Sequence, residues 1–157
     1  EEEIERDFNH PALIGWCPFN ETWDYKKRKQ YDPLLATVYD YTKAVDSTRP
    51  CIDTSGNFHV KTDIFDLHDY SYDVEFFKNN YDRFMTENYL YEHVLVDNPG
   101  RQTYKGEPVF ISEYGGIKWD VNSGIEKAWG YGNAPADEKE FLEVELKQIM
   151  LKIAKMK

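Results

Sequence analysis

Residues 9–21 of this chain have the sequence NHPALIGWCPFNE, in which an apolar run, Leu13–Phe19, ends abruptly at Asn20 and Glu21. Three later apolar runs have the same character and cover residues 50–54, 64–67 and 109–112. None of the four alternates cleanly between apolar and polar residues, and this is the pattern of strands that are covered on both faces. Such strands are typical of parallel sheets, so the four runs predict a parallel sheet.

Three segments with helical periodicity accompany these runs. Asp32 and Pro33 predict an N-cap followed by proline at the first helical position, and the helix is expected to continue to Asp46–Ser47. Its apolar stripe consists of Leu34, Val38, Tyr41 and Val45. Asp73 predicts the cap of a second helix, from Val74 to about Phe84. A third helix is expected from about Asp137 to the C-terminus, with a stripe of Leu142, Leu146, Ile149 and Ile153.

The alternation of strands and helices predicts an α/β fold, for which two parallel designs compete. A doubly wound dinucleotide-binding fold would carry a G-x-G-x-x-G turn after its first strand, but Gly130-Tyr131-Gly132 follows no predicted strand and lacks the third glycine. A (β/α)₈ barrel would instead place its chemistry at the C-terminal ends of several strands. The glutamates of the chain favour the barrel.

Glu21 follows the first apolar run, and Glu113 follows the last, 92 residues later (113 minus 21). Parallel strands bring all their C-terminal ends to one face, so the two carboxylates are expected to approach each other across the mouth of a barrel. Paired carboxylates are what cleavage of a glycosidic bond requires, one as proton donor and the other at the anomeric carbon. Either glutamate alone would be interpreted more simply as a solvated acid at a strand end.

Composition excludes several other classes of function. The 157 residues fit one domain, and their formal charge of −10 disfavours nucleic acid as a partner. No segment approaches the ~20 unbroken apolar residues of a membrane span. Cys17 and Cys51 lie in apolar runs and are expected to be buried, reduced thiols. The acidic residues 1–7 do not resemble a secretory signal, so a cytoplasmic location is slightly favoured.

Residues 9–21 resemble the N-H-P…W-x-x-x-N-E segment of glycoside hydrolase family 2, the family of β-galactosidases, β-glucuronidases and β-mannosidases. Asp46–Pro50 resembles its D-x-T-R-P segment before strand five, and Ile111–Gly115 resembles its strand seven. The resemblance implies a (β/α)₈ catalytic barrel, of which this chain matches strands four to seven. Because a complete barrel needs ~250 residues, we expect residues 1–157 to be a half TIM barrel, a fragment of a longer catalytic domain.

The resemblance also implies roles for individual residues. Glu21 would be the acid/base and Glu113 the nucleophile of a retaining mechanism, with β-galactosidase as the activity favoured most. The substrate-binding residues would be Asn20, His68, Tyr70 and Trp119, with Asn20 on the 2-hydroxyl of the sugar and Tyr70 orienting the nucleophile. Trp23 is expected to pack on neighbouring loops. The histidines are scattered and no H-E-x-x-H occurs, so neither a metal nor a cofactor is expected.

Three alternatives remain open at this point. The chain could be a non-catalytic carbohydrate-binding module, a subunit that completes another chain's barrel, or a (β/α)₈ glycosidase of another family in the same clan. Half a barrel leaves apolar side chains and strand edges uncovered, near Gly15 and Phe110. The expected partners are therefore a carbohydrate substrate and either a second copy of the chain or the missing remainder of the barrel.

Overall fold

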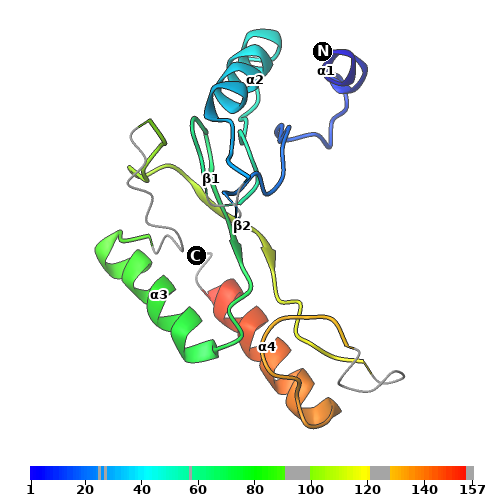
Figure 1. The fold of residues 1–157 in the computed structure, drawn as a ribbon, viewed down its shortest axis with the longest axis vertical. Coiled ribbons are helices and arrows are strands. Elements are labelled where there is room, and N and C mark those ends of the chain that lie inside the picture. Colours follow the sequence, from blue (N-terminus) through cyan, green and yellow to red (C-terminus); the bar gives the residue numbers. More distant parts are fainter. Residues whose placement is uncertain (25, 27, 57, 91–99, 121–127, 155–157) are drawn as a thin grey trace. The chain divides into compact units, whose positions relative to one another are not determined.

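The computed structural model describes residues 1–24, 26, 28–56, 58–90, 100–120 and 128–154, the last eight of these without their side chains. Its regular elements in chain order are α1 (Glu2–Asp7), α2 (Asp32–Val45), β1 (Phe65–Asp69), α3 (Val74–Glu87), β2 (Val109–Tyr114) and α4 (Glu138–Ala154) (Figure 1). No helix in the described ranges is long and apolar enough to cross a membrane.

The chain divides into two compact units. The first consists of residues 1–68 and 92–112, and the second of residues 69–91 and 113–157. The division passes through both strands, so that the larger part of each strand belongs to the first unit and its last residues to the second.

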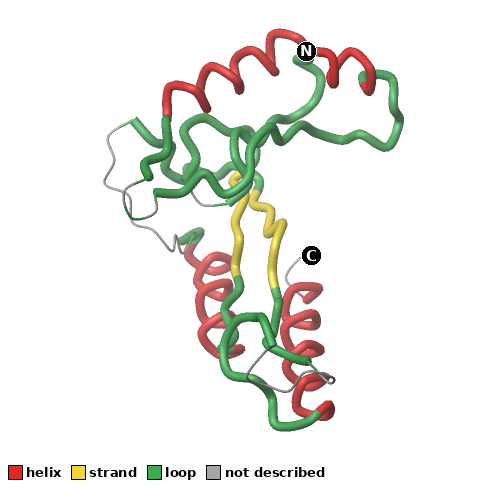
Figure 2. Tube along the Cα trace, turned by 45° about the vertical axis from the view of Figure 1, so that its right-hand side comes forward, coloured by secondary structure: helices red, strands yellow, loops and turns green. Residues whose placement is uncertain are grey.

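Strands β1 and β2 pair in a two-stranded sheet and run side by side in the same direction (Figures 1 and 2). They coincide with the last two apolar runs, whose prediction as parallel strands is confirmed. All five residues of β1 are buried, including two aspartates and a histidine. This strand therefore brings polar side chains into the interior of the protein.

The first two apolar runs do not form regular strands as predicted, although they do pair in parallel. Isolated bridges join Trp16 to Cys51 and Asn20 to Ser55, both with the same offset of 35 residues along the chain. The ladder is interrupted between them at Pro18, which has no N–H to donate. Opposite this gap the Thr54 N–H turns to the side chain of Asp53, at 2.8 Å. The missing N–H of Pro18 and the Thr54 N–H that bonds to a side chain together explain why the pairing is discontinuous.

Helix α2 differs from its prediction at its start and in its buried face. Its N-cap is Tyr31, so Asp32 lies inside the first turn and its carboxylate accepts hydrogen bonds from Arg101 instead of capping the helix. The residues that pack inward are Leu35, Tyr39 and Thr42. Two members of the predicted stripe, Leu34 and Tyr41, are 45% and 44% exposed.

The other two helices begin where the sequence predicts. The Asp73 carboxylate caps α3 by accepting hydrogen bonds from the N–H groups of Glu75 and Phe76, and the helix ends at Asn88 in the left-handed conformation. Asp137 accepts the N–H of Glu140 at the start of α4. On α4 the predicted apolar stripe begins with Leu142 and Leu146, which are both exposed. The side chains of Ile149 and Ile153 lie outside the described residues.

The core of the first unit is formed by Ile4, Trp16, Tyr39 and Cys51. The indole N–H of Trp16 donates to the buried carboxylate of Asp46 at 2.8 Å. Asp46 also accepts from Thr48 and from Arg49, whose guanidinium donates in turn to the backbone oxygens of Phe8 and Leu13. The D-S-T-R-P segment therefore fixes residues 8–16 against α2.

The prediction that both cysteines are buried is wrong for Cys17, which is exposed, and correct for Cys51. The two outcomes follow from the alternation of side chains along an extended segment. Trp16 points into the core, so its neighbour Cys17 points to the opposite face, which is uncovered in this chain.

Candidate active site

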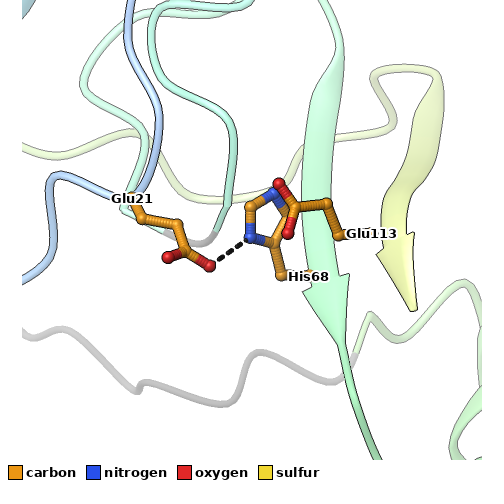
Figure 3. Close-up of side chains that lie close together, drawn as sticks. All are labelled: Glu21, His68 and Glu113. Carbon is orange, nitrogen blue, oxygen red and sulfur yellow. Dashed lines mark hydrogen bonds and ion pairs between the residues drawn. The ribbon is translucent and has the colours of Figure 1, made fainter. Parts of the chain in front are cut away.

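Glu21 lies immediately after the bridge between Asn20 and Ser55. Its N–H donates to the Ser55 carbonyl at 2.9 Å, and its φ of 49° is in the left-handed region. The carboxylate is 37% exposed and its Oε1 lies 2.8 Å from Nδ1 of His68 (Figure 3). Glu21 is therefore accessible from one side and held by an imidazole on the other.

His68 comes from β1, and its side chain is fully buried. Its second ring nitrogen, Nε2, lies 2.7 Å from Oγ of Ser55. The ring of Trp23 meets it edge-on, with 6.1 Å between centroids. Trp23 packs on the loop at Gly56, where a Cβ would lie 2.7 Å from the indole nitrogen and where φ is +109°. The expected packing role of Trp23 is thus confirmed.

Behind Ser55 lies Asp66, a completely buried residue of β1. Its Oδ2 accepts hydrogen bonds from Ser55 Oγ at 2.6 Å, from Ser112 Oγ at 2.9 Å and from the Gly56 N–H at 3.2 Å. Its Oδ1 is buried without a hydrogen-bond partner among the described residues. Sequence reasoning missed Asp66, Ser55 and Ser112, although an acidic residue inside a strand buried on both faces is itself a signal.

Glu113 belongs to β2 and to the second unit, together with Tyr70, which follows β1. The Tyr70 hydroxyl donates a hydrogen bond to Oε2 of Glu113. The ring of Tyr131 stacks on that of Tyr70, with 4.2 Å between centroids and 14° between planes. Close packing requires glycine at Gly116, where φ is +68° and a Cβ would lie 3.1 Å from the Tyr131 ring. In the sequence Tyr131 was considered only as part of Gly130-Tyr131-Gly132, and no role was predicted for its side chain.

The remaining two predicted site residues have different surroundings. Asn20 is exposed, and its backbone takes part in the bridge to Ser55. In the second unit Trp119 stacks on Phe141 of α4, with 5.5 Å between centroids and 25° between planes. One face of the Trp119 indole is therefore covered by a side chain of the same unit.

The geometry within each unit defines what each glutamate can do. Glu21 and the imidazole of His68 can hold and exchange a proton at a partly exposed position. The hydrogen bond from a phenol to Glu113 fixes the direction of the carboxylate lone pairs, as an attacking oxygen requires.

Sequence comparisons complete this description. No curated protein matches the chain. A family model described as "Glycosyl hydrolases family 2, TIM barrel domain" matches residues 1–143, which is most of the chain. The predicted resemblance is thereby confirmed, and the chain, with its parallel sheet and its helices, belongs to the TIM barrel domain of glycosyl hydrolases family 2.

Proposed function

We propose that this chain is the strand-four-to-seven half of the catalytic barrel of a retaining β-glycosidase, with terminal β-galactosides as the favoured substrates. One observation carries the proposal: each of two glutamates that follow apolar runs is hydrogen-bonded to a ring that suits its role. Glu21 is paired with the imidazole of His68, and Glu113 accepts from the phenol of Tyr70. Membership of a glycosyl hydrolase family supports the same conclusion.

In the proposed mechanism Glu113 attacks the anomeric carbon while Glu21 donates a proton to the departing oxygen. The bond from carbon to the leaving group breaks as the bond to Glu113 forms. In the second step Glu21 takes a proton from water, whose oxygen displaces Glu113 with net retention. The mechanism requires the two carboxyl groups to lie about 5–5.5 Å apart in the assembled barrel.

The other site residues bind the sugar in this proposal. Asn20 donates to the 2-hydroxyl, where a hydrogen bond that strengthens in the transition state accelerates cleavage. Trp119 stacks on the apolar face of the sugar ring, supported from behind by Phe141. Tyr70 keeps Glu113 in its attacking orientation, and His68 acts on the sugar site through Glu21.

The proposal is tested with aryl β-galactosides of graded leaving-group ability, in a protein that contains the rest of the barrel. Glu113→Gln should abolish turnover. Glu21→Gln should lower the rate by ~10²–10⁴ on substrates that need protonation and much less on activated ones. Glu87→Gln is the matched control, because Glu87 is an exposed acid at the end of α3 that is paired only to Arg83 among the described contacts.

The stereochemistry of the first-formed sugar, followed by NMR, provides an independent test. Net inversion would contradict the assignment of Glu113 as nucleophile. Equal losses on activated and unactivated substrates would contradict the assignment of Glu21 as acid. Sugar binding without any turnover would favour the non-catalytic carbohydrate-binding alternative.

A further inference from the structure

The hydrogen bonds around His68 connect Glu21 to a buried carboxylate that the proposed mechanism does not use. The connection runs from Asp66 Oδ2 to Ser55 Oγ at 2.6 Å, from Ser55 Oγ to His68 Nε2 at 2.7 Å, and from His68 Nδ1 to Glu21 Oε1 at 2.8 Å. All four residues belong to the first unit. Asp66 and His68 are both buried, so water has little access to the inner part of this chain of contacts.

The position of each hydrogen follows from the number that each group possesses. A serine hydroxyl has one hydrogen, and Ser55 donates it to Oδ2 of Asp66. Its oxygen can then only accept from His68, so the Nε2 atom of His68 must carry a hydrogen. Ser112 donates to the same Oδ2, and its Oγ lies 3.1 Å from Oγ of Ser55.

The opposite side of the imidazole then faces Glu21. A ring nitrogen and a carboxyl oxygen 2.8 Å apart share one proton, since two bare lone pairs would repel each other and two protons would clash. That proton lies either on Glu21, as a carboxylic acid, or on His68, as an imidazolium beside a carboxylate. Both forms can supply a single proton to a leaving group.

We propose that Asp66, acting through Ser55, fixes the Nε2–H form of His68 and so makes His68 and Glu21 the joint holders of the catalytic proton. Asp66 and Ser55 are positioning residues in this scheme, because neither contacts the reacting atoms. The inference rests on the proposed role of Glu21 as acid/base, and it deepens that role. In the first step the shared proton leaves with the departing oxygen, and in the second step a proton from water restores it to the same pair.

Among the described residues of the first unit, two further titratable side chains, Cys17 and His59, interact with Asp66. The residue Cys17 is exposed overall, but neighbouring atoms partly enclose its sulfur, and this local desolvation together with the Asp66 charge raises the pKa of the thiol, so it is uncharged at neutral pH. His59 contacts the backbone N and O of Asp66 through its Nε2, and its Nδ1 is paired to buried Asp53. Neither group interposes between Asp66 and Ser55 in the described structure.

The first experiment determines the tautomer of His68 in the 157-residue chain by two-bond ¹H–¹⁵N NMR, with His68→Gln to assign its signals. In the wild-type chain we expect a hydrogen on Nε2. Ser55→Ala should transfer the ring hydrogen of neutral His68 to Nδ1, where it would donate to Glu21. Ser55→Thr should restore the wild-type spectrum, and Ser112→Ala, the matched control, should leave the tautomer unchanged.

The second experiment measures the pH dependence of kcat on an unactivated aryl β-galactoside, in the protein that contains the rest of the barrel. In Ser55→Ala a hydrogen from Nδ1 would stabilise the Glu21 carboxylate, so the alkaline limb should move to lower pH. We expect a loss of about tenfold on that limb, the size of one added hydrogen bond to a charged group. The activated substrate should be affected much less.

The tautomer measurements test the inference directly. A wild-type His68 with its hydrogen on Nδ1 alone would overturn the inference, and so would a Ser55→Ala spectrum identical to that of the wild type. The NMR measurement requires no turnover. If the chain shows the expected tautomers but the protein that contains the rest of the barrel hydrolyses no glycoside, the tautomer assignment is supported and the proposed function is contradicted.

Discussion

Replacing Asp53 by asparagine should destabilise the chain more than any surface change of the same kind. The Asp53 side chain is completely buried, and each of its oxygens accepts two hydrogen bonds. Oδ1 accepts from the Thr54 N–H at 2.8 Å and from His59 Nδ1 at 2.7 Å. Oδ2 accepts from the N–H groups of Val60 and Lys61 at 2.7 and 3.0 Å.

An amide of the same shape cannot satisfy these four donors. Turned one way, its NH₂ group faces the N–H groups of Val60 and Lys61, and both lose their acceptor. Turned the other way, it faces the Thr54 N–H, which loses its acceptor, and Nδ1 of His59, which can accept instead by a change of tautomer. A hydrogen bond to a charged group contributes about 1.5–3 kcal/mol, so the loss of one or two predicts a decrease of about 1.5–6 kcal/mol in the free energy of unfolding. Since domains are stable by only about 5–15 kcal/mol, the effect should be large.

The assay is urea unfolding of the 157-residue chain, followed by tryptophan fluorescence. Asp40→Asn is the matched control, because Asp40 is an exposed carboxylate paired with the Lys61 side chain and should contribute about 0–1 kcal/mol. A cost for Asp53→Asn no greater than that of Asp40→Asn would refute the assignment of Asp53 as a buried acceptor of four hydrogen bonds.

Four further predictions concern the rest of the chain. Hydrogen bonds from Thr48, Trp16 and Arg49 hold the pKa of Asp46 well below its ordinary range, so the stability that Asp46 contributes should be fully present at neutral pH and lost progressively as the pH falls below about 4; in urea titrations the difference between Asp46→Asn and the wild type should therefore shrink as the pH is lowered from about 4. A thiol reagent at pH 8 should modify exposed Cys17, whereas Cys51, whose burial raises its pKa to about 12, should react only in urea; equal rates would contradict the described burial. Sedimentation should show a dimer, and we expect its two-fold interface to be apolar and larger than ~2,000 Å². A compact monomer at micromolar concentration would exclude the dimer. The isolated chain should hydrolyse aryl β-galactosides far more slowly than the ~10 s⁻¹ typical of enzymes, because we expect part of the set of residues that position the sugar to lie in the rest of the barrel.

Local signals predicted the elements well where the chain itself supplies the partner. Asp73 caps α3 because its side chain reaches N–H groups only two and three residues away. The buried face of α2 was predicted wrongly because Tyr39 and Thr42 look polar in sequence. The Tyr39 hydroxyl is satisfied by Asp63 at 2.6 Å, and Thr42 by the Val38 carbonyl at 2.8 Å. Both side chains therefore pack inward without leaving a buried hydroxyl group unpaired.

The residues of the candidate site also depend on contacts that the sequence alone does not reveal. The sequence pointed to Glu21 and Glu113 because each follows an apolar run, and resemblance added His68 and Tyr70. Nothing local indicated Ser55, which becomes important only because β1 places Asp66 and His68 beside it. Contacts between segments that are far apart in sequence, such as Ser112 with Asp66, require the assembled fold.

The backbone of Glu21 provides a way to measure how strongly natural selection has favoured its side chain. A left-handed φ of 49° costs an ordinary residue about 1–2 kcal/mol, and glycine adopts it freely. A chain selected for stability alone would carry glycine here. Glu21→Gly should therefore unfold at a higher urea concentration than Glu21→Ala. The difference is the free energy of unfolding that any side chain costs at this left-handed position, and the chain carries that cost at the glutamate proposed to donate the proton.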